Sequence, residues 1–103
     1  MALSGSNMID RITKNEERLD KSLESVKKLE EALSSFESNT KDIKALNKYY
    51  GSKTWFKDKE AYESGKIPRI KAGVLSEDAV WDLDDDIGNL IIEMQRIIND
   101  YKK

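Results

Sequence analysis

The sequence predicts an all-α protein: a small antiparallel helical bundle of three or four helices. Long N-terminal and C-terminal helices are expected to pack together, with a short helix and an ordered loop between them. Apolar residues recur at helical spacing from Ile9 to Phe36 and again from Val80 to Tyr101. Three of the five glycines and the one proline lie between Gly51 and Gly73, where they separate the shorter segments. At 103 residues the chain suits one small domain.

The first seven residues, MALSGSN, are small and patternless and precede a second methionine, so we expect a vector remnant there. The single helical domain is then expected to span residues 8–103. Within it, the first apolar stripe has members seven residues apart, with others three or four positions along. They are Ile12, Leu19, Val26 and Leu33, and then Leu23, Leu29 and Phe36. This pattern predicts an amphipathic helix of about 27 residues.

The next segments are divided by residues that compete with helical hydrogen bonding. Ser34–Thr40 (SSFESNT) favours a bend, or a break with Asn39 or Thr40 capping a new helix, over one straight helix. Beyond it, a helical stripe continues to Gly51, which can end the segment in the left-handed conformation. That stripe consists of Ile43, Leu46 and Tyr50. Ser52 can cap a short helix over Lys53–Ser64.

The short helix is expected to place three side chains on one face and then stop. The three are Trp55, Lys59 and Tyr62. Gly65 ends the helix and Pro68 prevents its resumption, so Ile67–Gly73 should be an ordered loop.

The last helix has the most regular pattern. Ser76 is expected as its N-cap, and Leu75 and Val80 suit a hydrophobic staple around that cap. Apolar residues then alternate in steps of three and four; they are Val80, Leu83, Ile87, Leu90, Met94, Ile97 and Tyr101. A second helix must cover this seam, and the first is the only one long enough.

Two stretches resemble a known family. YYGSKTW (Tyr49–Trp55) and ESGKIPRIKAGVLSEDAVWDL (Glu63–Leu83) are similar to an uncharacterised bacterial family catalogued as domain of unknown function 4298. That family has a helical N-terminal half, a YYGS-like turn, a glycine–proline loop and G-V-L-S-E-D before an aliphatic helix. At Ile70-Lys71-Ala72 this sequence lacks the leucine and second basic residue expected near the glycine, so no basic-patch role is transferred. The resemblance implies the fold and no activity.

Composition excludes several kinds of chemistry. The chain has no cysteine and no histidine, which removes thiolate–imidazole zinc sites and every Ser-His or Cys-His nucleophile. Carboxylates, lysines and tyrosines remain for acid–base work, each needing a strongly shifted pKa. We therefore expect no enzyme, no catalytic residue, no cofactor and no metal site. No apolar run approaches membrane-spanning length and no signal peptide is visible, so we expect a soluble cytoplasmic protein.

Charge is unevenly distributed along the chain. Lys53–Lys71 carries six basic and three acidic residues, whereas Ser76–Tyr101 carries one basic and eight acidic residues. The two segments are expected to face each other, and nucleic-acid binding is disfavoured because no open basic face is indicated. Asp82–Glu93 has the acidic spacing of a calcium loop, but Ile87 stands where a glycine is needed, which favours a helix.

Aromatic residues are concentrated beside Gly51. The candidate corner, for structure or for interaction, consists of Tyr49, Tyr50, Gly51, Trp55, Phe56, Tyr62, Arg69 and Lys71. Three roles fit the rings: burial that pins the turn to the last helix, a protein-docking patch, or stacking on single-stranded nucleic acid. Burial is favoured for Tyr50 and Trp55, and exposure for Phe56, which cannot share the face of Trp55.

Function is expected to lie in interaction rather than catalysis. A non-catalytic helical interaction or adaptor module with an unknown protein partner fits best, and a small immunity or antitoxin-type inhibitor is the alternative. Ile91, Ile92 and Ile98 indicate apolar surface beyond one seam, which a homodimer would bury.

Overall fold

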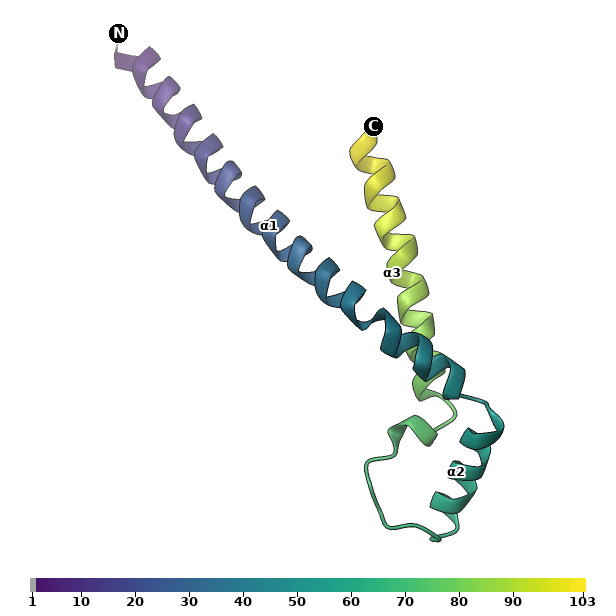
Figure 1. The fold of residues 1–103 in the computed structure, drawn as a ribbon. Coiled ribbons are helices and arrows are strands. Elements are labelled where there is room, and N and C mark those ends of the chain that lie inside the picture. Colours follow the sequence, from purple (N-terminus) through teal and green to yellow (C-terminus); the bar gives the residue numbers. More distant parts are fainter. Residues whose placement is uncertain (1) are drawn as a thin grey trace. The chain divides into compact units, whose positions relative to one another are not determined.

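The computed structural model describes residues 2–103, with side chains from Gly5 onward. Its elements are three α-helices and one 3₁₀ turn, and no strand occurs among the described residues. In chain order they are α1 (Ala2–Tyr49), α2 (Lys53–Glu63), η1 (Gly73–Leu75) and α3 (Ala79–Lys102). The predicted all-α class is confirmed (Figure 1).

The chain divides into two units, which are described separately. The first, residues 1–41, is built from α1 alone, and Met1 lies outside the described residues. The second, Asp42–Lys103, contains the last turns of α1 together with α2, η1 and α3. In this second unit α2, the following loop and η1 connect the end of α1 to the start of α3 (Figure 1).

The expected break near Ser34–Thr40 was wrong, since α1 is continuous there. The hydroxyls that compete with helix formation are satisfied inside the helix. Ser38 Oγ donates to the Ser35 carbonyl oxygen at 2.9 Å, and Thr40 Oγ1 donates to that of Glu37 at 2.8 Å. With no glycine or proline in the segment, these bonds back to the preceding turn do not interrupt the helix. α1 also includes Ala2–Asn7, ahead of the helical start expected near Ile9.

The turn from α1 into α2 forms as predicted. Gly51 has a φ of 76°, a left-handed conformation that side chains with a Cβ rarely adopt. Ser52 then caps α2, because its Oγ accepts the Trp55 backbone N–H at 3.1 Å. Gly65, with a φ of 75°, follows the end of α2.

The start of α3 differs from the expectation. The helix begins at Ala79, with Asp78 in the cap position and making no side-chain capping bond. Ser76 lies two residues earlier in an extended conformation, and its Oγ accepts the Ala79 backbone N–H at 3.1 Å. The serine hydroxyl thus still satisfies a free N–H of the first turn, although the helical hydrogen bonds begin later.

The core of the second unit is small and lies beside the α1–α2 turn. Three hydrophobic residues are buried: Trp55, Leu75 and Val80. The predicted stripe of Ile43 and Leu46 in the last turns of α1 and of Tyr50 just after it is half-buried, and the Tyr50 ring contacts Trp55 of the core. Asn47 Nδ2 donates to Asp84 Oδ1 at 3.1 Å, which joins the end of α1 to the second turn of α3.

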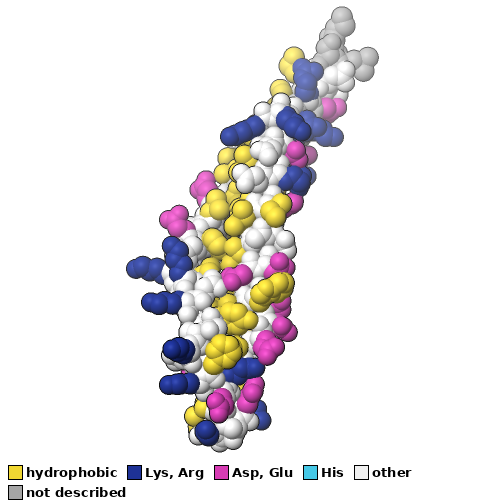
Figure 2. Space-filling model, turned by 90° about the vertical axis from the view of Figure 1, so that its right-hand side faces the viewer, with side chains coloured by type: hydrophobic (Ala, Val, Ile, Leu, Met, Phe, Trp, Pro, Cys, Tyr) yellow, Lys and Arg dark blue, Asp and Glu magenta, His cyan; other side chains and the backbone are white. Residues whose placement is uncertain are grey.

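Both long helices carry exposed apolar stripes. On α1 they run from Met8 to Phe36, with exposed fractions between 48% and 63%. On α3 the seam is buried at Val80, half-buried at Leu83 and Ile87, and exposed from Leu90 onward. Figure 2 shows hydrophobic side chains on one face, bordered by charged ones. In the part of the chain that the structure describes, no helix combines the length and hydrophobicity of a membrane span.

Candidate protein-interaction site

Trp55 is the centre of the aromatic corner. Its side chain is 3% exposed, and its indole N–H donates to the Val74 carbonyl oxygen at 2.9 Å. The ring meets Tyr50 edge-on, with centroids 5.1 Å apart and planes at 71°. It therefore joins the turn after α1 to the segment that precedes α3, and its polar edge is satisfied without water.

Tyr50 makes the second link between these segments. Its hydroxyl donates to the carbonyl oxygen of Glu77, just before α3 begins. With the Trp55 bond, this fixes both ends of the Val74–Glu77 segment against the α1–α2 turn. Trp55 is buried as expected, whereas Tyr50 is only half-buried, and both hydrogen bonds go to the segment before α3 and not to the last helix itself.

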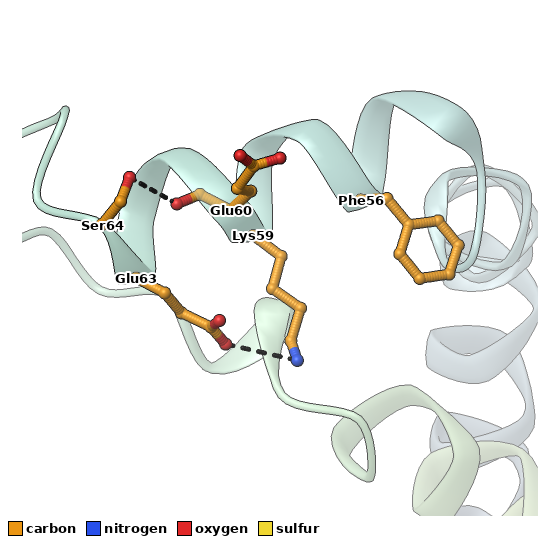
Figure 3. A pocket seen from close by; sticks show the side chains of 5 residues that line it. All are labelled: Phe56, Lys59, Glu60, Glu63 and Ser64. Atoms are coloured by element: carbon orange, nitrogen blue, oxygen red, sulfur yellow. Dashed lines mark hydrogen bonds and ion pairs between the residues drawn. The ribbon is translucent and has the colours of Figure 1, made fainter.

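Phe56 lies on the other side of the same turn of α2. It is 60% exposed, although its ring also meets Trp55 edge-on at 4.9 Å. A shallow hollow of about 510 Å³ lies beside it, lined by Phe56, Lys59, Glu60, Glu63 and Ser64. Figure 3 shows Phe56 at one end of this surface, with Lys59 and Glu63 meeting further along α2. The corner thus has a buried ring and an exposed ring on adjacent residues.

Lys59 of α2 lies close to the buried Trp55 ring and also lines the hollow beside Phe56. Its Nζ is 3.3 Å from Glu63 Oε1, 3.5 Å from Glu77 Oε1 and 5.7 Å from the Trp55 ring centroid. The hydrogen bond to Glu63, together with the charges of both glutamates, raises the pKa of Lys59. A lysine with a raised pKa stays protonated, so it is suited to ion pairing and not to proton abstraction.

Arg69, Tyr62 and the loop form a smaller cluster. The Tyr62 hydroxyl donates to the Ile70 carbonyl oxygen at 3.2 Å, and the Arg69 guanidinium lies 5.4 Å from the Tyr62 ring centroid. Lys71 is exposed and borders a hollow of about 210 Å³ between α2 and the loop. These contacts order the loop from within the same unit.

One ion pair joins the basic segment Lys53–Lys71 to the acidic segment Ser76–Tyr101: Lys59 Nζ lies 3.5 Å from Glu77 Oε1. Among the described residues, no ion pair of the basic segment reaches the carboxylates of Asp82–Asp86. Asp82–Glu93 is helical throughout, as Ile87 in the turn position favoured. Within the described chain, no group of three or more acidic side chains is placed to hold a metal ion.

Tyr49 gives the corner a pH dependence. Its hydroxyl donates to Asp58 Oδ2 at 2.6 Å, and this bond, with burial and the Asp58 charge, raises the pKa of Tyr49. A raised pKa means that the folded state holds the proton more tightly. The stabilisation is therefore complete below the ordinary tyrosine pKa of about 10 and is lost as pH rises through the folded pKa.

We expect Tyr49→Phe to lower the free energy of unfolding by about 1 kcal/mol at pH 7, since one hydrogen bond is lost. The difference from the unsubstituted chain should shrink above a pH of about 10, where Tyr49 ionises. Urea melts at several pH values measure it. Lys59 loses its proton in the same range in both proteins, so the comparison isolates Tyr49. A difference that grows with pH would contradict the assignment.

Comparison with known sequences identifies the family of the chain. Residues 12–102 match the family described as Domain of unknown function (DUF4298). The chain belongs to the DUF4298 family. The match covers α1 from Ile12 onward, the aromatic corner and α3 of this DUF4298 domain, including the YYGS and GVLSED segments on which the resemblance rested. No curated protein and no solved structure matches the chain significantly.

Sequence reasoning missed some contributors to the corner. Asp58 accepts a hydrogen bond from Tyr49, and the carbonyl oxygens of Glu77 and Val74 accept from Tyr50 and Trp55. The Glu77 carboxylate accepts separately from Lys59 Nζ. Every residue has a backbone carbonyl oxygen, so residue types do not indicate which carbonyls will accept hydrogen bonds. Asp58 does lie nine residues after Tyr49, but only the fold of the turn shows that the two meet.

Proposed function

We propose that this DUF4298 domain is a non-catalytic helical protein-interaction module. We also propose that α3 pairs antiparallel with the turns of α1 that precede Asn47, which completes a small bundle. The bundle would present the exposed side of the aromatic corner to a protein partner. The observation that supports this best is the apolar stripe left exposed on each long helix.

One contact between the end of α1 and the start of α3 supports the antiparallel direction of this pairing. Asn47, in the last turns of α1, bonds to Asp84 in the second turn of α3. Further along α3, Leu90, Met94 and Ile97 continue the seam with exposed fractions of 60%, 41% and 53%. Exposed side chains at this regular spacing favour a helical cover, because their burial is the main free-energy gain available to such helices.

A non-catalytic role is supported by the titratable groups of the corner. Without histidine or cysteine, a general base would need a lysine or tyrosine whose pKa is lowered toward neutrality. Acidic neighbours instead raise the pKa of both Lys59 and Tyr49. Their environment therefore stabilises the protonated forms, which is suited to structure and recognition.

Phe56 is our candidate for the residue that contacts a partner. A large aromatic ring that is 60% exposed beside an ion pair resembles the composition of interface hot spots. Because its neighbour Trp55 carries the structural contacts, Phe56 can be changed without removing the core.

The test is affinity capture from cells of the source organism with three forms of the chain. The unsubstituted chain and Ile92→Ala should retain the same partner protein, and Phe56→Ala should weaken its binding by about 2 kcal/mol or more. Ile92 is a matched control, since it is 69% exposed and far from the corner along the chain. Equal retention by Phe56→Ala would exclude Phe56 as the contact residue, and absence of any specific protein would contradict the interaction role.

A further inference from the structure

The two long helices differ twofold in length, and this difference has a consequence for α1. α1 contains 48 residues and α3 contains 24, corresponding to lengths of about 72 Å and 36 Å at 1.5 Å per residue. We infer that the N-terminal part of α1, Met8–Val26, is the contact surface for a second copy of this chain. The inference rests on the proposed pairing of α3 with α1.

The register of that pairing limits how much of α1 its own chain can cover. Asn47 lies opposite Asp84, as their hydrogen bond of 3.1 Å shows. Eighteen residues separate Asp84 from Lys102, the end of α3, and eighteen residues before Asn47 is Leu29. Even complete side-by-side pairing would therefore leave Met8–Val26 without a cover from α3.

The uncovered segment has a regular apolar stripe. Its members alternate in steps of three and four, with Glu16 as the one charged residue at a stripe position. They are Ile9, Ile12, Glu16, Leu19, Leu23 and Val26, and the hydrophobic members are 50% to 63% exposed. Asn15 and Ser22, at the margin of the stripe, bond to backbone carbonyls of α1 itself. They can lie at the edge of an interface without needing a partner.

Charge favours a second copy as the occupant. Met8–Lys28 carries six basic and five acidic residues, so it offers no strong field to a nucleic acid or to a strongly charged protein. Helices that lie on anionic membranes concentrate lysine and arginine on the polar face, which the five acidic residues prevent here. A second copy carries the same stripe and the same near-balanced charge, so two such surfaces are complementary.

The spacing of the stripe also determines the orientation. The spacings between successive stripe residues read 3, 4, 3, 4, 3, so the stripe is symmetric about a midpoint between Glu17 and Arg18. Antiparallel pairing about that point places Ile12 opposite Leu23, Ile9 opposite Val26, and Glu16 opposite Leu19. Parallel pairing would instead place Glu16 opposite the partner's Glu16, where like charges repel inside the seam. The dimer is therefore antiparallel.

Sedimentation velocity of the full chain across micromolar to submillimolar concentrations tests the association. The chain should dimerise, and Leu19→Glu combined with Leu23→Glu should weaken dimerisation by about 100-fold or more, since four carboxylates enter one seam. Lys21→Glu introduces the same residue on the opposite face of α1 and should dimerise normally. A monomeric chain, or a dimer unaffected by the double substitution, would overturn the inference.

Cysteine cross-linking tests the orientation, and the chain has no native cysteine to interfere. Under mild oxidation, a mixture of Glu16→Cys and Leu19→Cys chains should form the mixed disulfide, whereas Glu16→Cys alone should give little cross-linked dimer. The reverse pattern would show a parallel dimer and overturn the antiparallel assignment. The pairing of α3 with α1 is tested separately by Leu90, so the two failures can be told apart.

Discussion

Trp55→Ala should lower the free energy of unfolding by about 3–5 kcal/mol, because it empties the only buried aromatic site in the described core. The substitution removes a ring that is 3% exposed together with the hydrogen bond to the Val74 carbonyl oxygen. Tyr50 and Leu75 would then border a cavity in a core too small to collapse around it. The buried carbonyl would also lose its donor.

The matched control is Phe56→Ala, which removes a neighbouring ring that is 60% exposed. We expect it to cost less than about 1 kcal/mol, mostly through the lost edge-on contact with Trp55. Trp55→Phe separates the two contributions, since it keeps an aromatic ring and loses the indole N–H. Urea melts followed by far-ultraviolet circular dichroism measure all three. Equal costs for the Trp55 and Phe56 truncations would contradict the anchor role of Trp55.

Leu90→Ala should cost about 2–5 kcal/mol if α3 pairs with α1 as we propose, because the side chain would then be buried in the seam. Ile92→Ala provides the control within the same helix turn. Ile92 is 69% exposed and points away from the seam, so its truncation should stay within about half a kcal/mol. Both residues are exposed on their own helix, so only a covering helix can make their costs differ.

Denaturant melts at two protein concentrations complete this experiment. A Leu90 cost that does not depend on concentration indicates a cover from the same chain, whereas one that rises with concentration indicates a second copy. Costs that are equal and small for Leu90 and Ile92 would show that this seam stays open, which would contradict the bundle.

Local sequence signals predicted the helices and turns where a single residue type determines the geometry. Gly51 and Gly65 adopt positive φ, and Ser52 caps α2, because each conformation depends on the residue itself and its nearest neighbours. Trp55 on the buried face and Phe56 on the exposed face follow from the helical repeat.

Other features depended on competition between weak effects. Residues Ser34–Thr40 have poor helix propensity, but bonds such as Thr40 Oγ1 to the Glu37 carbonyl keep α1 continuous. The acceptors for Tyr50 and Trp55 are backbone carbonyls, which no residue pattern marks. The charge imbalance of Ser76–Tyr101 suggested pairing with the basic segment, and of its acidic residues only Glu77, just before α3, pairs with Lys59 among the described residues, alongside Glu63 of α2. Both partners lie closer along the chain than Asp82–Asp86 and therefore close shorter loops.

The contacts that define the aromatic corner also bear on how quickly this chain reaches its native state. Tyr49–Asp58, Trp55–Val74 and Tyr50–Glu77 join residues 9, 19 and 27 positions apart. Closing loops of this size takes well under a microsecond, and folding that relies on sequence-local contacts is correspondingly rapid. All three contacts lie within residues 49–77, so the corner can assemble without the later turns of α3. The aromatic corner would then form first, and it would set the direction in which α3 leaves it.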